Sequence, residues 1–393
     1  MPRVYAICLG LLMLQGWWMV LNARGAYQWQ INSFLPEKSW IDSAPGAVDG
    51  AVCGQMMLQI TAVIAAFFVM CDLSQTAAWR SRMLWTIVLS VTSIALYGIF
   101  QRLGLLPVIA AGGSRDTSFA TYSYWGDAGT LLDLAIPLAF GLWRTTSLNQ
   151  RKLRSLAIAC FLLCTAGVFI NVSKATMAIA VVILIALALL HRRSQSRSPA
   201  TRYQTIPATI GIACIIAIIV LAGRDVLWRR WARLPAMLNG DNARLLMLKT
   251  AWPMALDAGV MGNGPGSFKL LLPNSPYLLP DLYPRWIVSV YHPGTPVTPF
   301  GYVDNDYIQT IIEWGWFGAL LWAVVVIWIP ISSWRSQAEN WTTWQTFAML
   351  GLGAVLAHSI VDAPLQIASL QLFVAALVSF LVTRVNAAKK GCG

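Results

Sequence analysis

The sequence predicts an all-α protein: a polytopic transmembrane bundle of about ten helices with one large loop on the outer side. Of its 393 residues 57% are hydrophobic and only 11% are charged, a composition that excludes an ordinary soluble domain. The apolar runs are about 17–22 residues long, which is enough for a helix to cross ~30 Å of hydrocarbon. Because these runs do not alternate with a period of two, helices are favoured over a barrel.

The predicted spans are spread along the whole chain, with one long interruption after the seventh. They lie near residues 4–21, 54–73, 83–100, 126–143, 155–172, 175–191, 205–222, 309–330, 343–361 and 366–384. The chain therefore divides into N-terminal transmembrane helices (1–222), a large loop with interfacial helices (223–308), and C-terminal transmembrane helices with a short tail (309–393). The first run contains Trp17 and Trp18 and is long, so we interpret it as a retained span and not a signal peptide.

Lysine and arginine set the predicted orientation, because inner loops carry an excess of them. With the N-terminus inside, 15 basic residues fall in inner segments and 5 in short outer loops, while 8 lie in the 223–308 loop. Both termini are then cytoplasmic, and the net charge of +12 needs no nucleic-acid partner. The seven cysteines show neither a disulfide framework nor CxxC metal spacing. No cofactor is predicted.

A few charged side chains lie in or beside the apolar runs, nearly all at the outer end. A charge near the bilayer centre costs a few kcal/mol or more, so such residues are functional candidates by default. We expect them to contribute to a single polar site at the outer membrane surface. They are Asp127, Asp133, Lys174, Glu313, His358 and Asp362.

Two features stand out within the 223–308 loop. Arg244 falls in the first turn of a predicted helix, where its charge opposes the helix dipole, so we expect a bound anion or Asp241 to hold it. The Gly-rich run 262–268 looks like a nucleotide loop, but it follows no strand and lacks the Lys and Ser/Thr of a P-loop. A turn at which backbone approaches backbone, or a substrate, explains these glycines.

The order of motifs resembles the O-antigen ligase and polymerase family of membrane glycosyltransferases, from about residue 120 to 380. The motifs are a polar run before a helix containing Pro137, the Ser173-Lys174-Ala175 turn, Asn242-Ala243-Arg244, Trp252, the Gly-rich run, Asp304-Asn305-Asp306-Tyr307, Glu313-Trp314-Gly315, and the run from His358 to Asp362.

The resemblance implies a helical bundle in the bacterial inner membrane, with a large periplasmic loop over a cavity open to the outer leaflet. It implies a glycan donor on undecaprenyl pyrophosphate, with a glycan, a lipid A core or a protein hydroxyl as acceptor. It also implies membrane lipids as surroundings, no nucleotide sugar and no metal. A ligase and a polymerase of this family are not separated by these residues.

Two positions depart from the family pattern. Lys174 stands where the family usually has an Arg in the turn between two middle spans, and Asp304 stands where it usually has a His. A lysine keeps the charge but loses the bidentate fork of arginine. An aspartate, with an ordinary pKa of ~3.9, is a weak base unless its surroundings raise that pKa. His292 is a candidate to supply the missing imidazole.

The resemblance, together with the charges, suggests roles for individual residues. Cationic side chains would take the charge that develops on the pyrophosphate, and the acceptor hydroxyl needs a base within hydrogen-bond reach. The predicted pyrophosphate ligands are Lys174 and Arg244, helped by Arg285. The predicted bases are Asp304, Asp306 and His292, in that order. The supporting residues are Asp127, Asp133, Glu313, His358 and Asp362.

Structural roles are the alternative at several of these positions. Asp304 and Asp306 could cap the helix that follows. Glu313 could bond to backbone, and His358 and Asp362 could bond each other at i, i+4. For the whole protein, the same charges would suit a proton-coupled transporter or a non-catalytic partner in polysaccharide export.

Overall fold

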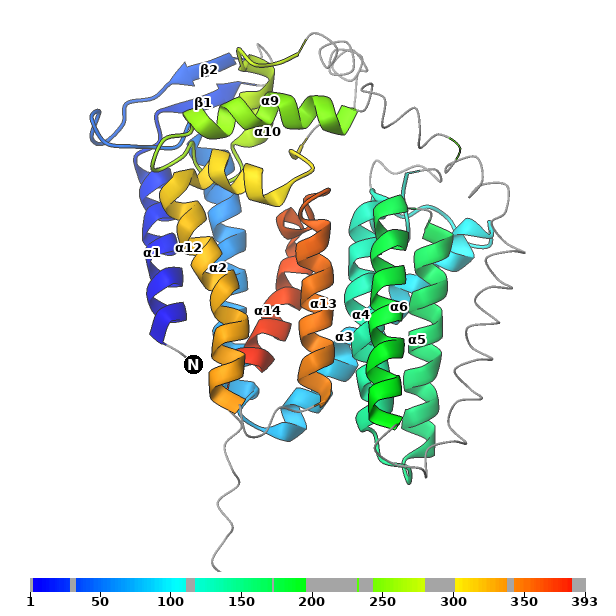
Figure 1. The fold of residues 1–393 in the computed structure, drawn as a ribbon. Coiled ribbons are helices and arrows are strands. Elements are labelled where there is room, and N and C mark those ends of the chain that lie inside the picture. The colour runs from blue at the N-terminus through cyan, green and yellow to red at the C-terminus, as the bar shows by residue number, and fades with distance from the viewer. Residues whose placement is uncertain are drawn as a thin grey trace, which may run out of the picture. The chain divides into compact units, whose positions relative to one another are not determined.

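The computed structural model describes residues 3–28, 33–110, 117–171, 173–195, 232, 243–279, 301–337 and 343–383. Within these ranges the chain is helical apart from a short hairpin (Figure 1), so the predicted all-α membrane fold is confirmed. The chain forms two compact units. The first comprises residues 1–75, 236–338 and 359–393, and the second comprises residues 76–235 and 339–358.

Nine of the predicted spans correspond to described helices. Six of the described helices are long and apolar enough to cross a membrane: α1 (Arg3–Leu21), α2 (Gly50–Leu73), α3 (Ala77–Arg102), α5 (Arg151–Asn171), α6 (Lys174–Gln195) and α12 (Asp306–Gln337). Three more are shorter or more polar: α4 (Trp125–Thr145), α13 (Thr343–His358) and α14 (Ala368–Val382). The span predicted at 205–222 lies outside the described residues.

The first unit combines long helices with the described part of the large loop. Helix α1 packs on α2 and α12, and α14 packs on α2 and α12. The loop contributes α9 (Ala243–Asp257), α10 (Phe268–Leu271) and a 3₁₀ turn (Leu272–Asn274). Figure 1 shows α9, α10 and the hairpin gathered at one end of α1, α2 and α12. A second 3₁₀ turn (Pro364–Gln366) precedes α14.

The hairpin was not predicted, because the 22–49 segment lacks a long alternating pattern. Strands β1 (Gly25–Gln28) and β2 (Ser33–Pro36) are antiparallel. Asp49 anchors the segment, since its carboxylate accepts a hydrogen bond from the backbone N–H of Tyr27 at 2.6 Å and caps α2 through the N–H of Val52 at 2.7 Å. One N-cap residue thus connects a membrane helix with the hairpin outside it.

The second unit is built around α4. Residues 128–143 of this helix are all buried, because α3, α5, α6 and α13 surround it. Small residues let α13 approach closely, as a Cβ at Gly141 would lie 2.7 Å from Phe347 and one at Gly351 would lie 2.8 Å from the Leu134 carbonyl oxygen. Helix α13 ends at His358, three residues before the predicted end of that span, so the expected shared helical face of positions 358 and 362 does not form.

Candidate functional site

The large loop has a small apolar core of its own, which its Pro- and Gly-rich sequence did not indicate. Helix α9, the 268–272 segment and the start of α12 meet there, around Met247, Ala251, Met254, Ala255, Phe268, Leu272, Val303, Ile308 and Ile312. One side of α9 is thereby fixed against α12. The first turn of α9 is then held beside the residues that precede α12.

Helix α12 is broken at Gly315, whose backbone (φ 66°, ψ −179°) is not helical and suits glycine almost exclusively. Figure 1 shows the two parts of α12 running in different directions. The break leaves backbone groups unbonded within the helix, and the 259–264 turn binds them. Asn263 and Gly264 donate N–H to the carbonyls of Ile312 and Glu313 at 3.2 and 2.9 Å. In return, Trp316 and Phe317 donate to the carbonyls of Gly259 and Val260, at 3.1 and 3.0 Å.

The glycines at this contact have no room for a side chain. A Cβ on Gly262 would lie 2.3 Å from the Gly315 nitrogen, and a Cβ on Gly315 would lie 2.3 Å from both the Gly262 nitrogen and the Val260 oxygen. We call this contact between residues 259–264 and 312–317 the glycine clasp. The Gly-rich run is therefore a turn at which backbone approaches backbone, as one of the two sequence interpretations held.

Glu313 is a buried residue of α12 that binds the segment following the 259–264 turn. Its side chain is 2% exposed, and its carboxylate accepts hydrogen bonds from the N–H groups of Gly266 at 2.9 Å and Phe268 at 3.4 Å, and from Gln309 Nε2 at 3.0 Å. Gln309 in turn accepts from the N–H of Val303 at 3.1 Å. These bonds connect the clasp to the residue just before Asp304. This geometry favours the structural role for Glu313.

Arg244, in the first turn of α9, is held by two carboxylates. Its Nε lies 3.4 Å from Asp304 Oδ2, and its Nη2 lies 3.6 Å from Asp362 Oδ2. The Arg244, Asp304 and Asp362 side chains are 38%, 30% and 7% exposed. Both distances exceed the ~2.7–2.9 Å of a tight charge-assisted hydrogen bond. The guanidinium thus lies at ion-pair distance from two carboxylates. Asp241, the partner considered from sequence, lies outside the described residues.

Asp304 has a left-handed backbone, with φ at 56°. Asp, Asn and His tolerate this region better than other side chains, and residues held there are concentrated at functional sites. The neighbours hold Asp304 in place, because Gln309 binds Val303 and the Asn305 amide donates to the Ile360 carbonyl at 2.8 Å. Burial raises the pKa of the Asp304 carboxyl, and the Arg244 guanidinium partly offsets this rise.

Asp306 is buried and joins two segments. Its carboxylate accepts hydrogen bonds from the Ser359 hydroxyl at 2.8 Å, the Leu365 N–H at 3.0 Å and Gln366 Nε2 at 3.3 Å. Neither Asp304 nor Asp306 caps α12, since the cap is Asn305, whose Oδ1 accepts from the Ile308 N–H at 3.0 Å. Asp306 therefore orders the approach to α14, and Asp304 is the more accessible carboxylate.

The other predicted site residues belong to the second unit. His358 Nε2 lies 2.8 Å from Asp133 Oδ2, and both side chains are almost completely buried, at 1% and 0% exposure. This pair joins α13 to α4, which fits a scaffold role. Lys174 is the first residue of α6, after the short turn that follows α5, and Asp127 lies in the first turn of α4. The roles assigned to these four residues stay predictions.

Two predicted residues, Arg285 and His292, lie outside the described residues, and so does the span at 205–222. Among the residues the structure describes, no group of three or more His, Cys, Asp or Glu side chains gathers in a way that could hold a metal ion.

Sequence reasoning missed the amides that position the site. Gln15, 4% exposed within the membrane helix α1, donates from Nε2 to the carbonyl of Trp314 at 2.7 Å and to that of Met261 at 3.2 Å. It therefore contacts both sides of the glycine clasp. Uncharged amides were not considered alongside the intramembrane charges. The signal available was a glutamine in the middle of an apolar run.

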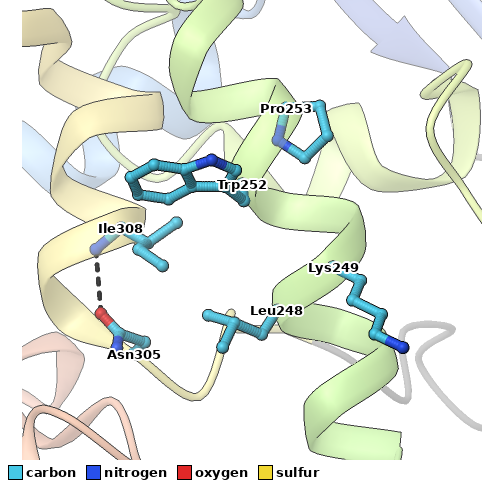
Figure 2. Close-up of a pocket in the computed structure, with 6 residues that line it drawn as sticks. All are labelled: Leu248, Lys249, Trp252, Pro253, Asn305 and Ile308. Carbon is cyan, nitrogen blue, oxygen red and sulfur yellow. Dashed lines mark hydrogen bonds between the residues drawn. The ribbon is translucent and has the colours of Figure 1, made fainter.

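A pocket of about 520 Å³ opens between α9 and the start of α12. It is lined by Leu248, Lys249, Trp252, Pro253, Asn305 and Ile308. Figure 2 shows Trp252, Leu248 and Ile308 lying between the two helices, with Asn305 at one end and the Lys249 ammonium pointing away from α12. Arg244 lies one helical turn before Leu248, and Asp304 directly precedes Asn305. The pocket therefore adjoins the Arg244–Asp304 ion pair.

The long apolar helices, together with the charged cluster of Arg244, Asp304 and Asp362, define a multi-pass helical membrane protein with a polar site. Residues 159–323, which run from α5 through the loop into α12, match the model of the family described as O-Antigen ligase. This part of the chain is thus similar to the O-antigen ligase family, and the resemblance predicted from the motifs is confirmed. No curated protein matches the sequence.

Proposed function

We propose that this O-antigen ligase-type membrane enzyme transfers a glycan from undecaprenyl pyrophosphate to an acceptor hydroxyl, at the periplasmic face of the bacterial inner membrane. The family supports a ligase- or polymerase-type glycosyltransferase. The observation that carries the finer proposal is the Arg244 guanidinium, which is partly exposed and lies within 3.4 and 3.6 Å of the Asp304 and Asp362 carboxylates.

Arg244 is suited to bind the pyrophosphate. Its planar fork of N–H donors matches phosphate oxygens as well as carboxylates. One cation faces two carboxylates, so a pyrophosphate that binds the guanidinium competes with them for its charge. Asp304 is 30% exposed and Asp362 only 7%, which makes Asp304 the one that is freer to leave.

A displaced Asp304 is suited to act as the base. When Arg244 turns to the pyrophosphate, the pKa of Asp304 loses the lowering effect of the guanidinium while the effect of burial remains. The acceptor oxygen then bonds to the sugar C1 as the C1–O bond to the pyrophosphate breaks. The bonding pair leaves on the pyrophosphate oxygen, and the acceptor proton passes to Asp304. Attack opposite the leaving group inverts C1.

The remaining assignments rest on the sequence resemblance alone. Lys174 and Arg285 would share the charge of the pyrophosphate, and His292 or Asp306 would be the alternative base. With cationic side chains in that role, the reaction needs no metal. The fixed hydrogen bonds of Asp306 support ranking it after Asp304.

A transfer assay tests this proposal directly. Purified protein is given an undecaprenyl-pyrophosphate glycan and a panel of acceptors, with and without EDTA. Replacing Arg244 with Ala should lower kcat/KM by about 10²-fold, because a cation that stabilises the leaving group is lost. Transfer should persist in EDTA, and Arg24→Ala, which removes another arginine outside the spans, should change little. Unchanged transfer by Arg244→Ala, or loss in EDTA that Mg²⁺ reverses, would contradict the proposal.

The charge cluster also predicts a pH effect. Asp304 must be ionised to act as a base, so kcat/KM should fall as the pH falls through its pKa. Asp362→Asn removes a negative charge and leaves Arg244 more available to Asp304. Both changes favour the ionised form and lower the pKa of Asp304, so the acid limb of the kcat/KM profile should move to lower pH. Asp42→Asn, which alters an exposed carboxylate bonded to Ser39, is the control. An upward shift, or none, would argue against Asp304 as the base.

A further inference from the structure

One wall of the pocket between α9 and α12 is the aromatic side chain of Trp252, which is not part of the apolar core of the loop. Met247, Ala251 and Met254 are the α9 residues buried in that core, and the pocket residues Ile308 and Leu248 belong to it or pack against it. Trp252 is not among the residues of that core, is 50% exposed, and lies between α9 and the start of α12 (Figure 2). A half-exposed indole in a concave site offers its negatively charged π-face to a ligand. The volume of about 520 Å³ is within the usual ~300–1,000 Å³ of small-molecule sites.

The pocket also contains hydrogen-bonding groups. Asn305 makes one bond through each end of its amide, to the Ile360 carbonyl and from the Ile308 N–H, at 2.8 and 3.0 Å. Because an amide side chain offers two donors and two acceptor lone pairs, one of each is left for a ligand. Among the described residues, none accepts a hydrogen bond from the indole N–H of Trp252. The pocket thus joins an apolar platform to a few hydrogen-bonding groups.

We propose that this pocket binds the pyranose ring that carries the acceptor hydroxyl, with one C–H face of the ring stacked on Trp252. This inference rests on the proposed function and narrows it, because it selects a sugar acceptor over a protein hydroxyl. The carbon-bound hydrogens of a pyranose face are weakly positive and complement the indole face, while its hydroxyls suit the free donor and acceptor of Asn305.

Position supports a sugar over a lipid chain. The pocket begins one helical turn from Arg244 and one residue from Asp304, so a bound ring has its hydroxyls next to the proposed base, as proton transfer requires. An isoprenoid chain in the same place would cover the Asn305 amide and the indole N–H without giving them partners, which is unfavourable. A serine or threonine acceptor has no ring to stack.

Binding is tested without relying on catalysis. Saturation-transfer-difference NMR is recorded on the full chain in nanodiscs, with methyl α-D-glucopyranoside, galactopyranoside and mannopyranoside as probes and geranyl phosphate as the lipid comparison. At least one pyranoside should receive saturation at its ring C–H groups. Trp252→Leu should weaken that binding about tenfold, and Trp252→Phe should weaken it less. Trp316→Leu is the matched control, because Trp316 is 45% exposed on α12 but does not line the pocket.

The outcomes separate this proposal from the proposed function. Absence of any Trp252-dependent pyranoside signal overturns the sugar site, including the case in which only geranyl phosphate binds through Trp252. In the transfer assay, Trp252→Leu should raise KM for the acceptor about tenfold and leave KM for the donor unchanged. If Trp252→Leu transfers glycan with an unaltered KM for the acceptor, the sugar site is overturned but the enzyme is not. Sugar binding through Trp252 without any transfer by the unsubstituted protein overturns the enzyme and the acceptor role, and leaves a sugar-binding site.

Discussion

Replacing Asp304 by asparagine is expected to lower the rate of glycan transfer by about 10²- to 10⁴-fold, the usual contribution of a general base. The substitution keeps the size of the side chain and removes only its ability to take a proton. Asparagine also tolerates the left-handed backbone at this position, where φ is 56°. The loss of rate can therefore be assigned to chemistry and not to a disturbed turn.

Histidine at the same position provides the decisive comparison. It also tolerates the left-handed region, and the resemblance places a histidine here in the family. Asp304→His should keep most of the transfer rate near neutral pH. Its acid limb should lie at higher pH, because the ordinary pKa of histidine, ~6.5, exceeds that of aspartate. Asp304→Ala should instead lose both the rate and some thermal stability, since alanine fits this backbone poorly.

The measurements are kcat/KM against pH and the midpoint of thermal unfolding for all three variants. Equal rates for Asp304→Asn and the unsubstituted protein would exclude Asp304 as the base and leave Asp306 and His292 as candidates. Inactivity of Asp304→His with a normal unfolding midpoint would mean that this chain requires a carboxylate here. The departure from the family residue would then be a real change of base.

Hydropathy was sufficient to find most of the fold, because crossing ~30 Å of hydrocarbon is a local demand on about 20 consecutive residues. The span predicted at 83–100 is the core of α3, and that at 54–73 nearly coincides with α2. The end of α13 was misjudged because Ile360 and Val361 are still apolar while the chain already turns there. That turn depends on the bonds that Asp306 makes to Ser359 and Leu365.

The charged residues of the site were found for a similar reason, since an arginine in the first turn of a helix is a local anomaly. Asp304 and Asp362 were also candidates, but their pairing with Arg244 was not predicted, because they lie far from it in sequence and only the fold brings them together. The amides of Gln15 and Gln309 were missed because an uncharged side chain is less costly in a helix and less conspicuous. The break in α12 was not predicted either, since the turn that binds it is 49 residues away in sequence.

The glycine clasp predicts the second large effect. Gly315→Ala places a Cβ 2.3 Å from two backbone atoms of the 259–264 turn, and it forces a non-glycine residue into a region of φ and ψ that essentially only glycine adopts. Neither the turn nor the helix can shift easily. Gln15 bonds to both of them, and Glu313 accepts a hydrogen bond from Gly266, just after the turn. We expect the free energy of unfolding to fall by about 3 kcal/mol or more.

Thermal and denaturant unfolding in detergent, followed by circular dichroism, measures this effect. Gly10→Ala in α1 is the matched control, because nothing lies within 4 Å of its new Cβ and alanine is the better helix former.

Gly262→Ala should destabilise the protein as Gly315→Ala does. The double variant should lose less stability than the sum of the two single variants, since both break the same contact. Each should also slow transfer, because Glu313 and Gln309 connect the clasp to Val303, the residue before Asp304. If Gly315→Ala unfolded like Gly10→Ala, α12 would have to be able to run straight, and the position of Asp304 could not depend on the break.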